Sequence, residues 1–154
     1  MLPGVMLAAA AALANVAFAK PEQIRSVQDP IFHYYLQAYP KNTSLAVMGP
    51  EATSEYFNIG STIQSTNTSL YLNVGSDSTS YKTLTFGAAA STTAWALEGD
   101  TIITANGSPY GRQLNFLACK LDSQYWQLYF QTGSATPSGQ TCSNYQSLHL
   151  PCLC

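Results

Sequence analysis

The sequence predicts an all-β protein: one compact antiparallel domain built from many short strands. Runs rich in Tyr, Val, Ile, Thr and Trp recur along the chain, and in several of them apolar and polar residues alternate. Clusters of Gly, Pro, Asn and Ser separate the runs, as turns do. No stretch after residue 19 sustains the period of about 3.6 residues that an amphipathic helix needs. These observations are typical of a β-sandwich or a small barrel.

The first expected strand covers residues 31–39, where Phe32, Tyr34, Leu36 and Ala38 would share one face because side chains alternate along a strand. The other expected strands are residues 44–47, 55–59, 62–64, 69–74, 83–86, 95–98, 101–104, 113–118, 125–130 and 145–150. Turns that contain glycine should join the third strand to the fourth and the seventh to the eighth as hairpins.

A short internal repeat favours one arrangement of these strands. The pattern Tyr56-x-x-x-Gly60 returns as Trp95-x-x-x-Gly99 at an offset of 39 residues. A polar turn and an alternating apolar strand follow each copy, and Trp126 opens a third, weaker one. A unit of about 40 residues that opens on an aromatic strand is what a β-trefoil would show, so we favour a trefoil-like domain over a β-sandwich.

Residues 1–19 have the features of a cleaved signal peptide. They contain no charged side chain, have an apolar middle and end in the small-x-small pattern Ala17-Phe18-Ala19. The alternative, an N-terminal membrane anchor, is less favoured because the apolar stretch is shorter than the ~20 residues that span a bilayer. We therefore expect a secreted protein, with an extended N-terminal arm over residues 20–30 and the all-β domain over residues 31–154.

Charge excludes two classes of partner. Six Lys and Arg stand against eight Asp and Glu, for a net charge of −2. The chain has neither the basic patch that binds nucleic acid nor a basic run for a membrane surface, so we expect neither partner. The oligomeric state is not determined by these features.

The four cysteines predict disulfides and no metal centre. They are Cys119, Cys142, Cys152 and Cys154. An even number in a secreted chain implies bridges, and four cysteines allow three pairings. A bridge between Cys152 and Cys154 would be strained, so we expect each of them to pair with one of the two earlier cysteines. Zinc is less favoured because the Cys-x-Cys spacing has no second close pair, and we expect no cofactor.

Three Asn-x-Ser/Thr sequons lie in polar, turn-like stretches. Their asparagines are Asn42, Asn67 and Asn106. In a secreted chain such sites predict N-linked glycosylation.

No catalytic site is expected from the spacing of the acidic, histidine and serine residues. Glu98 and Asp100 are close enough to suggest a glycosidase pair, but they flank Gly99 in an expected hairpin and are more typical of a charged turn. His149 lies near Ser147, and a triad assembled through space with an aspartate has no support from spacing. His33 and Asp122 are further candidates of the same kind. Neither Gly-x-Ser-x-Gly nor His-Glu-x-x-His occurs.

Tyrosine is more abundant than a small core normally uses. The residues concerned are Tyr34, Tyr35, Tyr39, Tyr71, Tyr81, Tyr110, Tyr125, Tyr129 and Tyr145. Aromatic faces stack on sugar rings, although Tyr also suits half-buried sheet surfaces. The triplet Gln124-Tyr125-Trp126 is similar to the Gln-x-Trp signature of ricin-type lectins.

A pattern of strands and cysteines between residues 54 and 152 carries a family resemblance. Its elements are Ser69-Leu70-Tyr71-Leu72, Trp95-Ala96-Leu97, Phe116-Leu117-Ala118-Cys119, Trp126-Gln127-Leu128-Tyr129-Phe130, Gly133, Pro137-Ser138-Gly139, Cys142 and Pro151-Cys152. In these the chain resembles the PhiA-like fungal cell wall proteins. It departs from them in having no cysteine before Cys119 and in carrying Cys154.

The resemblance implies a secreted, non-enzymatic protein of the fungal cell wall, in a family linked to asexual spore formation. Wall polysaccharide would be its partner, and its role would be structural or carbohydrate-contacting. The alternative class is a secreted effector or lectin-like protein that acts on a host or competitor, because such proteins are also small and disulfide-bonded. A hydrolase is the third hypothesis.

Overall fold

Strands make up nearly all of the regular structure. The computed structural model describes residues 20–151; the expected signal peptide, Cys152 and Cys154 lie outside the described residues. The strands are β1 (Arg25–Ser26), β2 (Tyr35–Tyr39), β3 (Asn42–Gly49), β4 (Phe57–Ile59), β5 (Ile63–Ser65), β6 (Tyr71–Val74), β7 (Tyr81–Gly87), β8 (Trp95–Glu98), β9 (Thr101–Thr104), β10 (Phe116–Lys120), β11 (Trp126–Gln131), β12 (Cys142–Gln146) and β13 (Leu148–His149). A short 3-10 helix, η1 (Glu51–Thr53), follows β3. Within the described part of the chain, no helix is long and apolar enough to cross a membrane.

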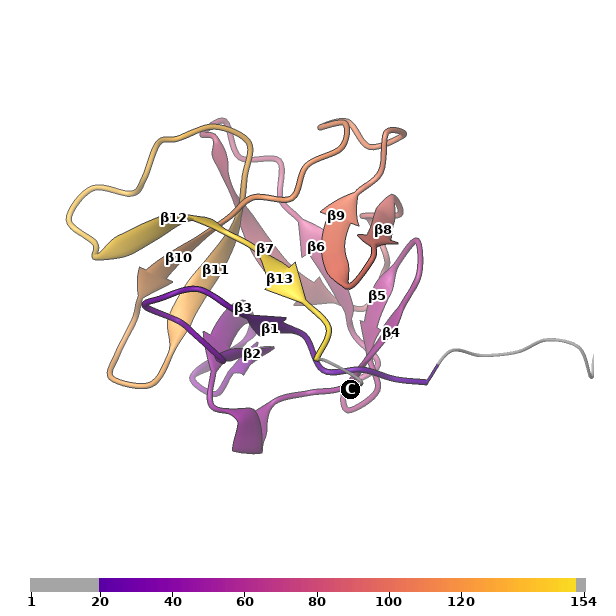
Figure 1. Cartoon of the computed structure of the whole chain (residues 1–154), viewed down its shortest axis with the longest axis horizontal. Helices are drawn as coiled ribbons and strands as arrows, with labels where there is room; N and C mark the ends of the chain where they lie inside the picture. The colour runs from indigo at the N-terminus through magenta and orange to yellow at the C-terminus, as the bar shows by residue number, and fades with distance from the viewer. Residues whose placement is uncertain (1–19, 152–154) are drawn as a thin grey trace, which may run out of the picture.

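The strands join in one continuous antiparallel sheet that curls into a nearly closed barrel (Figure 1). The order along the sheet is β4-β5-β6-β7-β11-β3-β2-β1-β13-β9-β8, while β10 pairs with β11 and β12 pairs with β10. This confirms the predicted class, a compact antiparallel all-β domain. Continuity from one end to the other distinguishes it from the two separate sheets of a sandwich. The threefold repeat of a trefoil stays a prediction.

Three long strands, β3, β7 and β11, pair with one another. The first half of β11 pairs with β3, where Trp126 is opposite Met48, and its second half pairs with β7, where Phe130 is opposite Lys82. β3 and β7 meet at Leu45. Each of these three strands therefore pairs with both of the others. This three-way junction joins strands β4, β5 and β6 to the part of the sheet that contains β2, β1, β13, β9 and β8.

Aromatic side chains fill the centre of the barrel. Phe130 of β11 is fully buried, and its ring centroid lies 5.7 Å from that of Phe116, 6.2 Å from Trp95 and 5.3 Å from Tyr110. Alternation along β11 directs Trp126, Leu128 and Phe130 into this core. Tyr129, on the opposite face, packs instead in a small outer cluster with Leu117 and Cys119.

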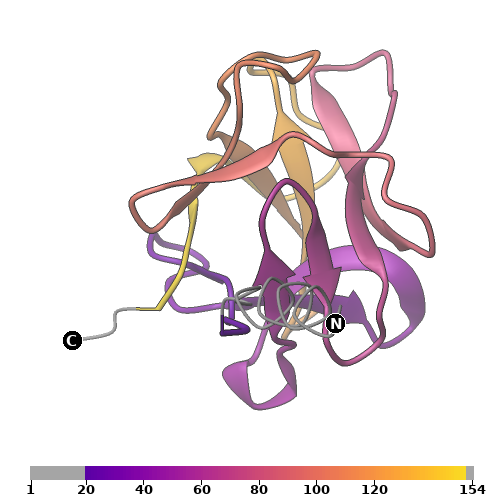
Figure 2. The ribbon, with the colours of Figure 1, turned by 90° about the vertical axis from the view of Figure 1, so that its right-hand side faces the viewer.

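Both expected hairpins form, and they close the barrel. β4 pairs with β5 around Gly60, and β8 pairs with β9 around Gly99, whose φ of 63° explains the glycine at that turn. The backbone N–H of Trp95 donates to the carbonyl of Ser61 at 3.0 Å, so the two ends of the strand order touch. In Figure 2 the β8–β9 hairpin passes beside the tip of β4–β5. The two copies of the repeated sequence motif therefore belong to the two hairpins that meet where the barrel closes.

The expected strand over residues 31–39 begins only at Tyr35. The backbone N–H of Tyr34 donates to the carbonyl of Ile31, which forms a turn, and His33 takes a left-handed φ of 60°. Phe32 therefore does not share the buried face of Leu36, and its side chain is 53% exposed. Likewise, the run 145–150 is divided into β12 and β13 by a break at Ser147.

The expected N-terminal arm is extended, but the structure places part of it within the domain. β1 lies between β2 and β13, and Ile24 and Ser26 have no exposed surface. Glu22 forms an isolated bridge with Phe57. Residues 20–30 show no clear period because only short pieces of them pair, with a different strand each time.

The expected disulfides are realised in one bridge, between Cys119 and Cys142. Neighbouring strands β10 and β12 hold these residues opposite each other, with their Cα atoms 4.1 Å apart. The expectation that Cys152 and Cys154 pair with these two cysteines is therefore wrong, because each cysteine forms only one bridge. The bridge ties β12 to the outer face of the barrel.

Reduction of the Cys119–Cys142 bridge should lower the free energy of unfolding by about 3 kcal/mol, because the bond constrains the unfolded chain over a separation of 23 residues. Thermal unfolding followed by circular dichroism, with and without reductant, measures this. The double variant Cys119→Ala, Cys142→Ala is the control, since its remaining response to reductant reports the other cysteines. Equal responses of wild type and double variant would contradict the prediction.

Truncation of the central core residue, Phe130→Ala, should cost about 3–5 kcal/mol of folding free energy, because three aromatic rings lose their partner. Tyr145→Ala is the matched control: Tyr145 is 53% exposed, so its loss should change stability by about 0.5 kcal/mol or less. Chemical denaturation gives both values. Similar losses for the two variants would refute this account of the core.

Candidate functional site

Two adjoining hollows lie on the loops beside β2, β3 and β11. One, of about 380 Å³, is lined by Tyr39, Pro40, Lys41, Asp122, Ser123, Gln124 and Tyr125. The other, of about 280 Å³, is lined by Phe32, His33, Tyr34, Gly49, Pro50, Ser123 and Gln124. Both hollows are lined by Ser123 and Gln124, so they adjoin each other at the loop before β11. We call these lining residues the aromatic surface.

The first hollow is built around the carboxylate of Asp122. One of its oxygens accepts the backbone N–H groups of Gln124 and Tyr125, each at 2.9 Å, and the other accepts the hydroxyl of Tyr39 at 2.8 Å. The rings of Tyr39 and Tyr125 meet edge to face, with centroids 5.5 Å apart. The aspartate thus orders both the turn into β11 and the tyrosine on β2.

Hydrogen bonding shifts the pKa values of this pair in opposite directions. The backbone N–H of Gln124, followed by the Tyr39 hydroxyl and other donors, lowers the pKa of Asp122 below its ordinary value. The hydrogen bond to Asp122 raises the pKa of Tyr39. At neutral pH the hollow therefore holds an ionised carboxylate and a protonated phenol.

The second hollow carries an exposed stacked pair. The rings of Phe32 and His33 lie parallel within 20°, with centroids 3.8 Å apart. The backbone N–H of His33 donates to the carbonyl of Ser26 at 3.0 Å, which helps hold the residue in its left-handed conformation. A non-glycine residue in this region is uncommon and is often found at functional sites. Phe32 presents an exposed apolar ring to solvent in the same hollow that Gln124 lines.

Gly49 allows β3 to approach the aromatic surface closely. A Cβ atom at this position would lie 2.6 Å from the ring of Tyr125, which is a shorter distance than Cβ atoms in proteins keep from other heavy atoms. Glycine is therefore required at this position for the Tyr125 ring to pack this closely against β3.

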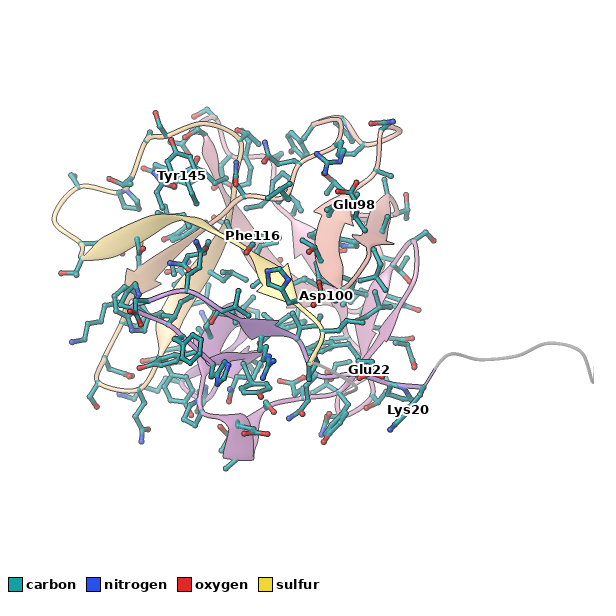
Figure 3. All side chains as sticks on the ribbon, viewed as in Figure 1. Lys20, Glu22, Glu98, Asp100, Phe116 and Tyr145 are labelled. Atoms are coloured by element: carbon teal, nitrogen blue, oxygen red, sulfur yellow. A yellow bond between two sulfur atoms is a disulfide. The ribbon has the colours of Figure 1, made fainter. Side chains whose placement is uncertain are left out.

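Of the two alternatives for Glu98 and Asp100, a glycosidase pair or a charged turn, the structure supports the charged turn. Glu98 forms a two-pronged ion pair with Arg112, whereas Asp100 accepts a hydrogen bond from Nδ1 of His149 at 3.3 Å. The Arg112 guanidinium lowers the pKa of Glu98, and the His149 contact lowers the pKa of Asp100. Glu98 and Asp100, both labelled in Figure 3, therefore bind different partners and do not face one sugar from two sides.

The structure brings together three residues that the spacing did not connect: Ser147, His149 and Asp100. The Ser147 hydroxyl lies 2.8 Å from Nε2 of His149, whose Nδ1 faces Asp100. One signal was available, because residues two apart on a strand share a face. The pairing with Asp100 comes from β13 lying next to β9, which the sequence does not show.

The three sequon asparagines, Asn42, Asn67 and Asn106, are all exposed, so each is accessible to a glycan. Asn42 opens β3, and its side-chain oxygen accepts the hydroxyl of Ser44. The side-chain oxygen of Asn67 accepts a hydrogen bond from the backbone N–H of Tyr56 at 3.1 Å. Glycosylation at these positions stays a prediction.

Among residues 20–151 no three His, Cys, Asp or Glu side chains are grouped as a metal ion would need. No family model matches the chain, and neither a curated protein nor a solved structure matches it. The resemblance to PhiA-like proteins therefore stays a prediction, and the function is argued from the described surface.

The Asp122 contacts should make stability depend on pH. A carboxylate whose pKa is lowered in the folded state stabilises the fold above its unfolded pKa of about 3.9, and this contribution disappears as pH falls through the folded value. Asp122→Asn should therefore melt below wild type at pH 6, and the difference should shrink steadily below about pH 4. Melting temperatures across pH 2–7, at roughly constant ionic strength, measure it. A constant difference at every pH would contradict the ionic role.

Proposed function

We propose that this protein is secreted and held at a cell wall, where it contacts polysaccharide through the aromatic surface. The main observation behind the proposal is the exposed Phe32 ring, which is stacked on His33 in a hollow that Gln124 also lines. The adjoining hollow contains the hydrogen-bonded pair Asp122 and Tyr39. We propose that this surface binds polysaccharide and does not catalyse a reaction.

The chemistry of the aromatic surface suits a carbohydrate. A pyranose ring has an apolar face of C–H groups and an edge of hydroxyls. Phe32 offers a flat apolar contact, while the Asp122 carboxylate accepts and the Gln124 amide both donates and accepts hydrogen bonds. A few placed polar groups among aromatic side chains is the usual composition of a small-molecule site.

Other features support the wall as the setting. The net charge of −2 gives no strong field for an ionic partner. The Cys119–Cys142 bridge suits an oxidising compartment outside the cell. The resemblance to PhiA-like proteins adds the fungal cell wall and a link to asexual spore development as parts of the proposal.

A secreted effector or lectin-like protein acting on a host or competitor is the second candidate. The same aromatic surface favours it, because recognition of a foreign glycan needs the same chemistry. Fractionation separates the two: a wall protein remains in the washed walls of the producing cells, whereas an effector is recovered from the medium and accumulates on host contact.

Binding to insoluble glucan, chitin and mannan tests the proposed function directly. We expect one of these to retain the protein, and Phe32→Ala and Gln124→Ala each to weaken binding about tenfold, since a lost stacking or hydrogen-bond contact costs about 1.4 kcal/mol. Tyr145→Ala is the matched control, because Tyr145 is also 53% exposed but lies on β12. Sedimentation at a series of polysaccharide concentrations gives each Kd.

Two results would count against the proposal. No retention on any of the polysaccharides would remove the binding function. Equal loss of binding in the Phe32→Ala and Tyr145→Ala variants, with both folded by circular dichroism, would remove the aromatic surface as its location.

A further inference from the structure

Ser147, His149 and Asp100 form a hydrogen-bonded line outside the aromatic surface. The Ser147 hydroxyl lies within hydrogen-bond distance of Nε2 of His149, at 2.8 Å. Nδ1 of the same ring donates to Oδ1 of Asp100 at 3.3 Å, and the Thr101 hydroxyl lies at the same distance from Nδ1. The serine and the aspartate therefore engage the two different nitrogens of one imidazole.

The sheet holds these three residues in register. Ser147 directly precedes β13 and His149 is the last residue of that strand, and their side chains meet with the Ser147 hydroxyl 2.8 Å from Nε2 of His149. His149 is opposite Thr101 in the β13–β9 pair, and the backbone N–H of Leu150 donates to the carbonyl of Asp100 at 2.8 Å. These backbone contacts place Asp100 at the end of the His149 ring without help from the side chains.

The arrangement matches the division of roles in a nucleophile–base–orienter relay. A carboxylate that accepts the Nδ1 proton fixes the tautomer in which Nε2 is the acceptor. Nε2 then has its lone pair directed at the serine hydroxyl, as a general base requires. Hydrogen bonding from His149 also lowers the pKa of Asp100, so this group is ionised at neutral pH.

Arg25 supplies a positive charge on the same face. It lies opposite His149 in the β1–β13 pair, so the two side chains project to the same side of the sheet, with Cβ atoms about 5 Å apart. Its Nε is buried and has no hydrogen-bond partner among the described residues. Arg25 therefore places a positive charge on the same side of the sheet as His149.

We propose that Ser147 is a nucleophile for acyl transfer from small esters, with His149 as its general base and Asp100 as the positioning residue. The Ser147 oxygen bonds to the ester carbonyl carbon while its proton moves to Nε2 of His149. The bond to the alcohol oxygen breaks, and the alcohol leaves with that proton. Water then attacks the acyl-serine, His149 takes its proton, and the carboxylic acid is released as Ser147 regains a proton.

The exposure of the relay defines the class of substrate. Ser147 is half-buried, so part of the nucleophile is open to solvent. At the other end of the line the Asp100 side chain is 64% exposed, and that of His149 between them is 19% exposed. This partial exposure suits a short acyl group on an accessible alcohol, and an O-acetyl group on a carbohydrate has this chemistry. The inference does not depend on the proposed binding function, and it departs from the resemblance, which implies a non-enzymatic protein.

A fluorophosphonate probe and p-nitrophenyl acetate test the inference on the secreted, folded chain. We expect mass spectrometry to locate the phosphonyl adduct on Ser147, and p-nitrophenol release to fall at least about 100-fold in Ser147→Ala and His149→Gln. Asp100→Asn should also slow release and labelling, whereas Asp100→Glu, which keeps the carboxylate, should restore part of both. Ser138→Ala, at an exposed serine of the β11–β12 loop, should behave as wild type.

Melting temperatures of all variants separate a lost reaction from a lost fold. If wild type releases p-nitrophenol no faster than Ser147→Ala, or if the probe labels Ser138 and Ser147 equally, the inference is overturned. Equal losses in Asp100→Asn and Asp100→Glu would remove Asp100 from the relay. None of these results bears on retention by polysaccharide, so the two proposals fail independently.

Discussion

The pairing of β3, β7 and β11 with one another is the constraint on which the rest of the molecule depends. β11 shares its length between the other two strands, and its inner residues Trp126, Leu128 and Phe130 supply the centre of the core. The same strand also pairs along its length with β10, which in turn pairs with the disulfide-bonded β12. The loop that leads into β11 is ordered in addition by the hydrogen bonds that Asp122 accepts from the backbone N–H groups of Gln124 and Tyr125. Residues 122–125, which line the larger hollow, form this loop.

Three carboxylates of this protein stabilise local structure by accepting hydrogen bonds. Asp122 orders the entry to β11, Glu98 holds Arg112, and Asp100 meets His149 across the β9–β13 pair. Each of these carboxylates has a lowered pKa because it accepts hydrogen bonds in the folded state. The consequence for function is that both candidate sites contain an ionised carboxylate with a defined direction, on a molecule whose overall charge is small.

The two candidate sites are connected through β1. This short strand lies between β2, which carries Tyr39 of the aromatic surface, and β13, which carries His149. Arg25 is opposite Tyr35 on one side and His149 on the other. The N-terminal segment is therefore structural, and its loss would be expected to disturb both surfaces. A binding surface and a reactive serine on one small barrel would allow attachment to a polymer and modification of its esters, each testable without the other.

The sequence by itself determined the strand-rich class and both hairpins, because alternation and turn residues are local properties of the chain. It also drew attention to the triplet Gln124-Tyr125-Trp126, whereas Asp122 was named only as a candidate for a triad that spacing did not support. It also indicated disulfide bonding from the number of cysteines. Only the tertiary structure decided that Cys119 pairs with Cys142, that Phe32 is exposed beside a turn, and that Ser147, His149 and Asp100 meet. The physical reason is the same in each case: these contacts follow from which strands become neighbours, and strand order depends on packing between segments far apart in the chain, which no local pattern encodes.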